Sequence, residues 1–261
     1  MFDQAGRIQR GFRVTARAVA GFAAGFFLAM SAPWLVRAAD EVTVSKSWDP
    51  TFQDAPGVAR WMLAAKKGDL RELKAARERG MNVDQRAKDG WTALMWASTL
   101  GHEKAVEYLL DQGAKIDAVN PEGATSLILA SGQEEMGIVR LLLERGADPD
   151  IRNAYGSSAL LMAIIDERED FVKALLEGGA DPNLSDSSGT TPLMAAAQRG
   201  DIDSVKQLVK YGAELNRTNP SGRSALDAAR AAGYQDVARY LKDRGARGRW
   251  MNAWDPTNFH L

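Results

Sequence analysis

The amino-acid sequence predicts an all-α solenoid of six helix–turn–helix repeats with projecting hairpin loops. Three observations lead to this fold class: glycines recur every 33 residues, leucines and alanines share that period, and no insertion or deletion breaks the phase. Since 24 of the 261 residues are glycine, chance would place about one glycine in the twelve positions of the two rows, whereas all twelve are glycine. The two glycine rows are Gly57, Gly90, Gly123, Gly156, Gly189 and Gly222, and Gly80, Gly113, Gly146, Gly179, Gly212 and Gly245.

The first 38 residues are expected to be a secretory signal peptide rather than part of the fold. Arginines at 7, 10, 13 and 17 precede an uncharged stretch over residues 18–36, and small residues lead to a cleavage position after Ala38. The alternative is an uncleaved anchor in the inner membrane formed by residues 18–36, which just reach bilayer length. Both readings place the rest of the chain outside the cytoplasm, in the periplasm.

Composition excludes several classes of protein and of chemistry. With 45% hydrophobic and 26% charged residues, the chain is neither a disordered tail nor a collagen. The formal net charge of -1 gives no reason to expect nucleic acid as a partner. The absence of cysteine excludes disulfides, thiol nucleophiles, lipoprotein attachment and cysteine-based metal sites, so packing alone has to stabilise the fold.

Each repeat begins with a short helix that a hydroxyl side chain caps. In one copy, Thr191 can cap the helix and Pro192 suits its first position. Leucine and alanine recur at the same places in the repeat and form its thin apolar face. These rows are Leu94, Leu127, Leu160, Leu193 and Leu226, and Ala64, Ala97, Ala130, Ala163, Ala196 and Ala229.

A second helix and a loop complete the repeat. Gly200 turns the chain, with Gly68, Gly101 and Gly233 in phase, and the second helix then places Val205, Leu208 and Val209 on one face. Gly212 suits a left-handed helix end, and the polar stretch up to Gly222 suits a projecting hairpin. A unit this small cannot bury its faces alone, so stacking of neighbours is expected to form the core.

The repeats occupy residues 54–246, between a flanking segment over 39–53 and a tail over 247–261. Both flanks contain Trp-Asp-Pro-Thr, at Trp48 and at Trp254. Either the flanks cover the exposed ends of the stack, which a solenoid has to shield, or they dock on a partner.

These features resemble ankyrin repeats: Thr191-Pro192-Leu193, the recurring Gly-Ala pairs and the 33-residue period. The resemblance covers about residues 54–246, with the first unit, from Gly57, as an N-terminal cap. The chain departs from the family pattern in two ways. The histidine that usually follows the leucine is replaced, for example by Met194, and Glu134 and Glu167 stand where an inter-helix glycine is usual.

No arrangement of residues in the sequence indicates catalysis. His102 occupies a position that is usual in the resembled family and is expected to be structural, and His260 lies next to the C-terminus. No catalytic triad, phosphate-binding loop or metal-ligand spacing is present, so neither an enzyme, a cofactor nor a metal is expected.

By resemblance, ankyrin arrays bind proteins through their hairpin tips and the concave face of the first helices. Aromatic and arginine side chains dominate interface energetics. Trp91 could instead cover the edge of the first unit and Ile165 could pack on its neighbour, while Trp96 is expected in the core. The candidate protein-binding residues are Lys88, Trp91, Tyr155 and Arg223 at the tips, and Leu100, Ile165 and Arg199 on the concave face.

The sequence therefore predicts a non-catalytic protein–protein binding module of the cell envelope. Its partner is another protein, and the free chain is expected to be a monomer. The membrane is a partner only if the N-terminal segment is not cleaved. The alternative is an accessory, protective or inhibitory (immunity-like) protein that controls a specific exported enzyme.

Overall fold

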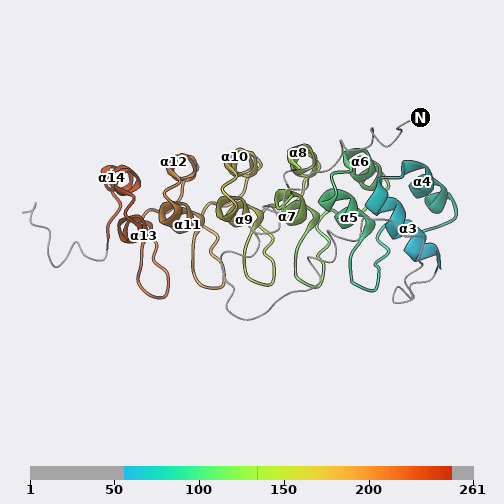
Figure 1. The fold of residues 1–261 in the computed structure, drawn as a ribbon, viewed down its shortest axis with the longest axis horizontal. Helices are drawn as coiled ribbons and strands as arrows, with labels where there is room; N and C mark the ends of the chain where they lie inside the picture. Colours follow the sequence, from blue (N-terminus) through green and yellow to red (C-terminus); the bar gives the residue numbers. More distant parts are fainter. Residues whose placement is uncertain (1–55, 134, 249–261) are drawn as a thin grey trace, which may run out of the picture. The chain divides into compact units, whose positions relative to one another are not determined.

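The computed structural model describes residues 56–133 and 135–248, which form six consecutive pairs of α-helices (Figure 1). The first helices of the pairs are α3 (Pro56–Lys67), α5 (Ala93–Thr99), α7 (Ser126–Ser131), α9 (Ala159–Ile165), α11 (Pro192–Arg199) and α13 (Ala225–Ala232). The second helices are α4 (Leu70–Glu78), α6 (Glu103–Asp111), α8 (Met136–Glu144), α10 (Glu169–Glu177), α12 (Ile202–Lys210) and α14 (Gln235–Asp243). The six predicted repeats are confirmed.

A hydroxyl side chain caps each first helix from α5 to α13. Its oxygen accepts a hydrogen bond from the backbone N–H three residues later, which satisfies a donor that the helix leaves unpaired. The donor–acceptor distances lie between 3.2 and 3.4 Å. The capping residues are Thr92, Thr125, Ser158, Thr191 and Ser224.

In the five pairs whose joining residue the structure describes, that residue is left-handed. Gly200 has φ 75°, and Glu167, which replaces the glycine in the fourth repeat, has φ 57°. A side chain is disfavoured in this region, so Glu167 holds a locally strained backbone. The first tip glycine differs from its row, because Gly57 lies within α3, which begins one residue earlier at Pro56.

The core lies between neighbouring repeats. Each first helix packs against the first helix of the next pair, and each second helix packs against its counterpart (Figure 1). The leucine row from Leu94 to Leu226 is at most 1% exposed, and the alanine row from Ala64 to Ala229 is also buried. Small alanines let the first helices approach closely, and each buried leucine contributes about 1.5–3 kcal/mol. Stacking therefore forms the core, as predicted.

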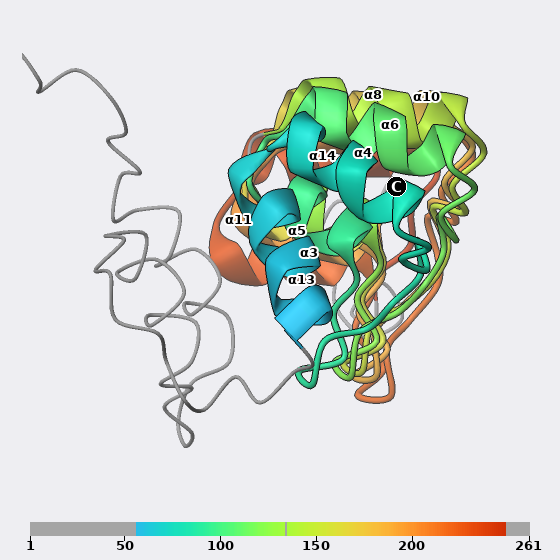
Figure 2. The same ribbon diagram turned by 90° about the vertical axis from the view of Figure 1, so that its right-hand side faces the viewer.

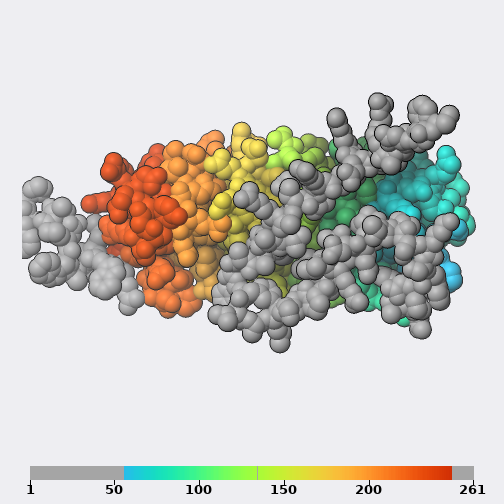
Figure 3. All heavy atoms as spheres, viewed as in Figure 1, coloured from blue at the N-terminus to red at the C-terminus, as the bar shows by residue number. Residues whose placement is uncertain are grey.

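The connections between pairs project as hairpin loops on one side of the helix layers (Figures 1 and 2). Within the described ranges, backbone pairing in these loops is limited to the isolated bridges Arg86–Thr92 and Thr218–Ser224. Successive repeats form adjoining bands of the surface in chain order (Figure 3). The fold therefore exposes a periodic surface of loop tips and helix ends.

The predicted signal or anchor over 1–38, the flank over 39–53 and nearly all of the tail over 247–261 lie outside the described residues, as do Trp48 and Trp254. None of the described helices has the length and apolarity that crossing a membrane requires.

Candidate functional site

An amide or carboxylate side chain shapes the hairpin tips. Asn153 Oδ1 accepts hydrogen bonds from the backbone N–H groups of Tyr155 and Ser157, both at 3.0 Å. Asp186 and Asn219 accept the corresponding bonds in the next two hairpins at 2.9–3.0 Å. Such side chains imitate a backbone turn. This row was not predicted, although its 33-residue spacing is visible in the sequence.

Hydrogen bonds also hold each hairpin against the next. The backbone N–H and the hydroxyl of Ser187 both donate to the carbonyl oxygen of Tyr155, at 3.1 and 2.8 Å. On the other side, the N–H of Ala154 donates to the carbonyl of Glu122 at 2.8 Å. The tip that carries Tyr155 is therefore fixed from both neighbouring repeats.

A second row of side chains joins the repeats at the base of the hairpins. Asp150 Oδ1 accepts a hydrogen bond from the N–H of Asp181 at 2.8 Å, and Asn183 Oδ1 accepts one from Glu214 at 2.7 Å. Burial raises the pKa of Asp150, while the bond from Asp181 opposes that shift. Equivalent bonds reach Asp84, Asp117 and Asn216 from the following repeat.

Three of the four predicted tip residues are exposed: Lys88, Tyr155 and Arg223. Tyr155 has the largest exposed fraction of the described large hydrophobic residues, at 74%. These residues come from different hairpins, so they form a row along the tips rather than one cluster (Figure 1).

Trp91 is buried, so it is not the exposed anchor that was predicted at this tip; it covers its neighbour, which was the alternative. Its side chain is 8% exposed and stacks on Trp96, with the ring centroids 4.3 Å apart. The amino group of Lys66 lies 3.8 Å from the centroid of the Trp96 ring. Trp96 was expected in the core but is half-buried and packs against it, and the Trp91 ring and the Lys66 amino group cover part of its ring.

The predicted concave-face residues lie at the ends of the first helices. Leu100 follows α5 and is 36% exposed, whereas Ile165, the last residue of α9, is half-buried against the core. Arg199 ends α11 and donates to the carboxylate of Glu167 at 2.5 Å. Both side chains of this ion pair are solvent-exposed, so it contributes little to stability.

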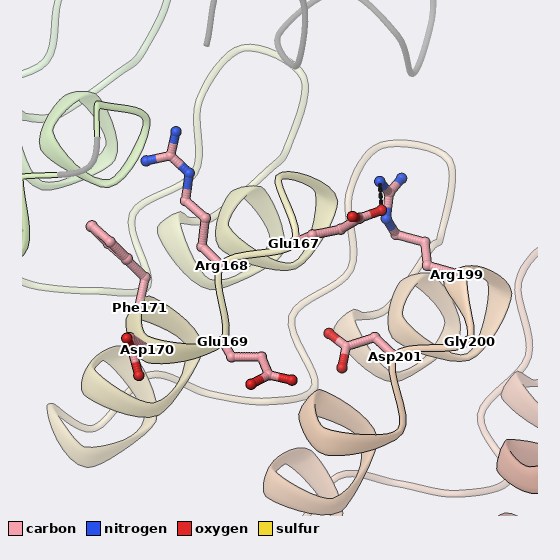
Figure 4. A pocket seen from close by; sticks show the side chains of 8 residues that line it. All are labelled: Glu167, Arg168, Glu169, Asp170, Phe171, Arg199, Gly200 and Asp201. Atoms are coloured by element: carbon pink, nitrogen blue, oxygen red, sulfur yellow. Dashed lines mark hydrogen bonds and ion pairs between the residues drawn. The ribbon is translucent and has the colours of Figure 1, made fainter. Parts of the chain in front are cut away.

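A shallow hollow lies between the fourth and fifth repeats, where the helices of each pair meet (Figure 4). Four of the eight residues that line it are acids, among them Glu167, Glu169 and Asp201. The Arg168 side chain points to the preceding repeat, where it donates hydrogen bonds to the backbone carbonyls of Ser131 and Gly132 at 3.0 and 3.1 Å. Among the described residues, no group of three or more histidine, cysteine or carboxylate side chains is placed to hold a metal ion.

Two carboxyl groups have raised pKa values: Glu169, which lines this hollow, and Asp166, which precedes its lining residue Glu167. Burial raises the pKa of Asp166, and the nearby Arg168 and Arg199 oppose the shift. One of its oxygens is buried without a hydrogen-bond partner among the described residues. Burial and then the neighbouring Asp201, Asp203 and Asp170 raise the pKa of Glu169. Like charges close together disfavour ionisation, which accounts for the second effect.

His102 has the structural role that was predicted. It precedes α6, and its Nε2 atom lies 2.8 Å from the backbone carbonyl of Lys66 in the preceding repeat. The imidazole thus joins two inter-helix turns.

The comparisons with known proteins agree with this architecture. A family model described as ankyrin repeats (3 copies) matches in four overlapping windows, over residues 44–120, 61–153, 113–186 and 160–249. A 1.00 Å crystal structure of an ankyrin repeat domain from Acinetobacter baumannii AYE is similar, with 29% sequence identity and a TM-score of 0.67. That match covers 71% of this chain and 97% of the other. No curated protein sequence matches the chain. The chain belongs to the ankyrin-repeat family.

Proposed function

We propose that this chain is an exported, non-catalytic protein-binding module of the cell envelope that uses its hairpin tips and the face of its first helices. Ankyrin repeats are generally protein–protein interaction modules, and proteins built from them are typically non-catalytic. The exposed side chain of Tyr155 is the observation that carries the proposal.

Tyr155 supports binding because an exposed aromatic stands on a fixed backbone. The hairpins on both sides hydrogen-bond to its tip, so little ordering remains to be done when a partner arrives. Tyrosine is enriched among the residues that dominate binding energy. Ile165, the last residue of α9 in the same repeat, is half-buried and places a partly exposed apolar side chain on the first helices.

The test compares capture of envelope proteins by tagged variants of the full chain. Tyr155→Ala combined with Ile165→Ala should abolish capture of a partner that the wild type retains and that mass spectrometry identifies. Lys173→Ala, an exposed change on α10, is the matched control and should retain it. Equal capture by the wild type and the double variant, with unchanged melting curves, would contradict the proposed surface. The mass of the free protein in analytical ultracentrifugation should be that of a monomer.

Export is supported by the order of basic, uncharged and small residues within 1–38. N-terminal sequencing of the native protein should find a mature chain that begins near Ala39, in the periplasmic fraction. An intact Met1 on protein recovered with the membranes would favour the anchor over 18–36. Recovery from the cytosol would contradict export altogether.

A further inference from the structure

The first helices differ in charge from the second helices. The second helices contain both signs, with ten lysines or arginines and twelve acids. The first helices contain one acid, Asp227, which is buried. Their five cations are Arg60, Lys66, Lys67, Arg199 and Arg230, three of which belong to α3.

A row of large apolar side chains runs along the same helices. Its members are 33 residues apart and so occupy equivalent positions: Leu63, Trp96, Leu129, Met162, Ala195 and Ala228. Leu63 is 49% exposed, and the next three are half-buried. The two alanines are buried. Large apolar groups therefore remain accessible only in the first four of these positions.

Cations and apolar groups coincide at the N-terminal end of the described array. Arg60, Leu63 and Lys67 are spaced i, i+3 and i+7 on α3 and so share one face. Trp96 and Leu100 of the next repeat continue the apolar area. These five residues are referred to as the α3–α5 patch.

The two cations of this patch, Lys67 and Arg60, can pair with acidic groups of a partner. Lys67 is exposed and forms no ion pair with a described residue. Arg60 lies 3.7 Å from a Glu72 oxygen, and its side chain is 68% exposed, so this pair is weak. Separate carboxylates of a partner can therefore pair with Arg60 and Lys67 while apolar groups cover Leu63 and Leu100.

We propose that the α3–α5 patch binds an acidic amphipathic helix of the partner; this deepens the proposed function and rests on it. Packed helices lie about 8–10 Å apart, so equivalent residues of α3 and α5 repeat at about that distance. Residues i and i+7 of a helix are about 10.5 Å apart, so a helix laid across the first helices presents one apolar residue to each. Glutamates beside those residues meet Arg60 and Lys67.

A designed peptide pair tests this directly. The acidic probe is a labelled 21-residue helical peptide with leucines at positions i, i+3 and i+7 and glutamates on the flanks of that stripe. The control peptide carries lysine in place of every glutamate. Fluorescence anisotropy with the full chain should give saturable binding of the acidic peptide, and binding of the lysine peptide at least about tenfold weaker.

Charge reversal then locates the site. Arg60→Glu with Lys67→Glu should weaken the acidic peptide at least about tenfold. Arg71→Glu with Lys74→Glu makes the same charge change on exposed residues of α4 and should leave binding within about twofold. Circular dichroism checks that both variants fold. Equal weakening by both variants, equal binding of both peptides or no saturable binding would overturn the proposal.

Other occupants give distinct results. If the acidic peptide binds only after Trp48→Ala, the patch is occupied by the chain's own N-terminal flank. If the chain forms a dimer that Arg60→Glu with Lys67→Glu disrupts, the patch is occupied by a second copy. Either result overturns the proposal. If the peptide fails to bind while Tyr155→Ala with Ile165→Ala still abolishes partner capture, the proposed function stands and this inference fails.

Discussion

Two identical substitutions in one repeat should separate backbone strain from packing between hairpins. Gly156 and Gly179 both have positive φ, at 77° and 91°. A Cβ atom at Gly179 would meet nothing within 4 Å, whereas one at Gly156 would lie 2.7 Å from the backbone nitrogen of Ser187 in the next hairpin. Gly179→Ala therefore introduces strain alone, and Gly156→Ala adds a clash.

The magnitudes follow from these two environments. Left-handed strain costs about 1–2 kcal/mol per residue, and the stiffer unfolded chain returns about 0.4–1 kcal/mol, so Gly179→Ala should destabilise by about 1 kcal/mol. At Gly156, overpacking adds about 1–3 kcal/mol. Displacement of Ser187 also weakens its two hydrogen bonds to Tyr155, each with a net value of about 1 kcal/mol. Gly156→Ala should therefore destabilise by about 3 kcal/mol.

Urea denaturation of the two full-length variants measures the difference. Gly156→Ala should lower the free energy of unfolding by at least about 1 kcal/mol more than Gly179→Ala does, with unchanged denaturant slopes. A difference below about 0.5 kcal/mol would refute the claim that hairpin tips pack tightly against their neighbours. A larger loss at Gly179 would show that the helix end, not the hairpin, limits stability.

Three further predictions concern the core, the aromatic stack and a buried carboxyl group. Leu160→Ala should destabilise by about 2–5 kcal/mol in denaturant, because Leu160 is fully buried between repeats. Trp91→Ala should destabilise the fold by about 3 kcal/mol and Tyr155→Ala by less than about 0.5 kcal/mol. The reverse order would contradict the burial of Trp91 and indicate that its side chain is exposed. Because the pKa of Asp166 is raised in the folded chain, its charge opposes folding above that pKa and has no effect below the ordinary carboxyl range. Asp166→Asn should therefore raise the melting temperature near pH 7 and leave it unchanged in strong acid; a gain that persists in acid would contradict this cause.

The repeat phase and the helix ends could be predicted because they depend on residues close in sequence. Thr191, Pro192 and Gly212 act through local backbone conformation, so their roles followed from type and spacing and are confirmed. The leucine and alanine rows identified the buried faces for the same reason, since a regular helix turns a spacing into a face.

The features that the sequence did not predict correctly are contacts between repeats. Trp91 was expected at an exposed tip, but its counterparts Ala124 and Ser157 in the next two repeats are buried as well, and of the four later counterparts only Arg223 is exposed. The Trp96 ring lies beside Trp91 and the two rings stack. No spacing rule shows this, because it depends on the side chain that the fold brings alongside. The hydrogen bonds from Ser187 and Asp181 to the preceding repeat were missed for the same reason.

Photo-crosslinking in living cells is the most direct test of a protein-binding surface at the hairpin tips. A photoreactive amino acid at position 155 lies at an exposed hairpin tip, and one at position 173 lies on the exposed surface of α10. We predict that position 155 crosslinks to a defined envelope protein, which mass spectrometry identifies, and that position 173 does not. Crosslinks from position 173 alone, or none from either position, would contradict a binding surface formed by the tips and first helices.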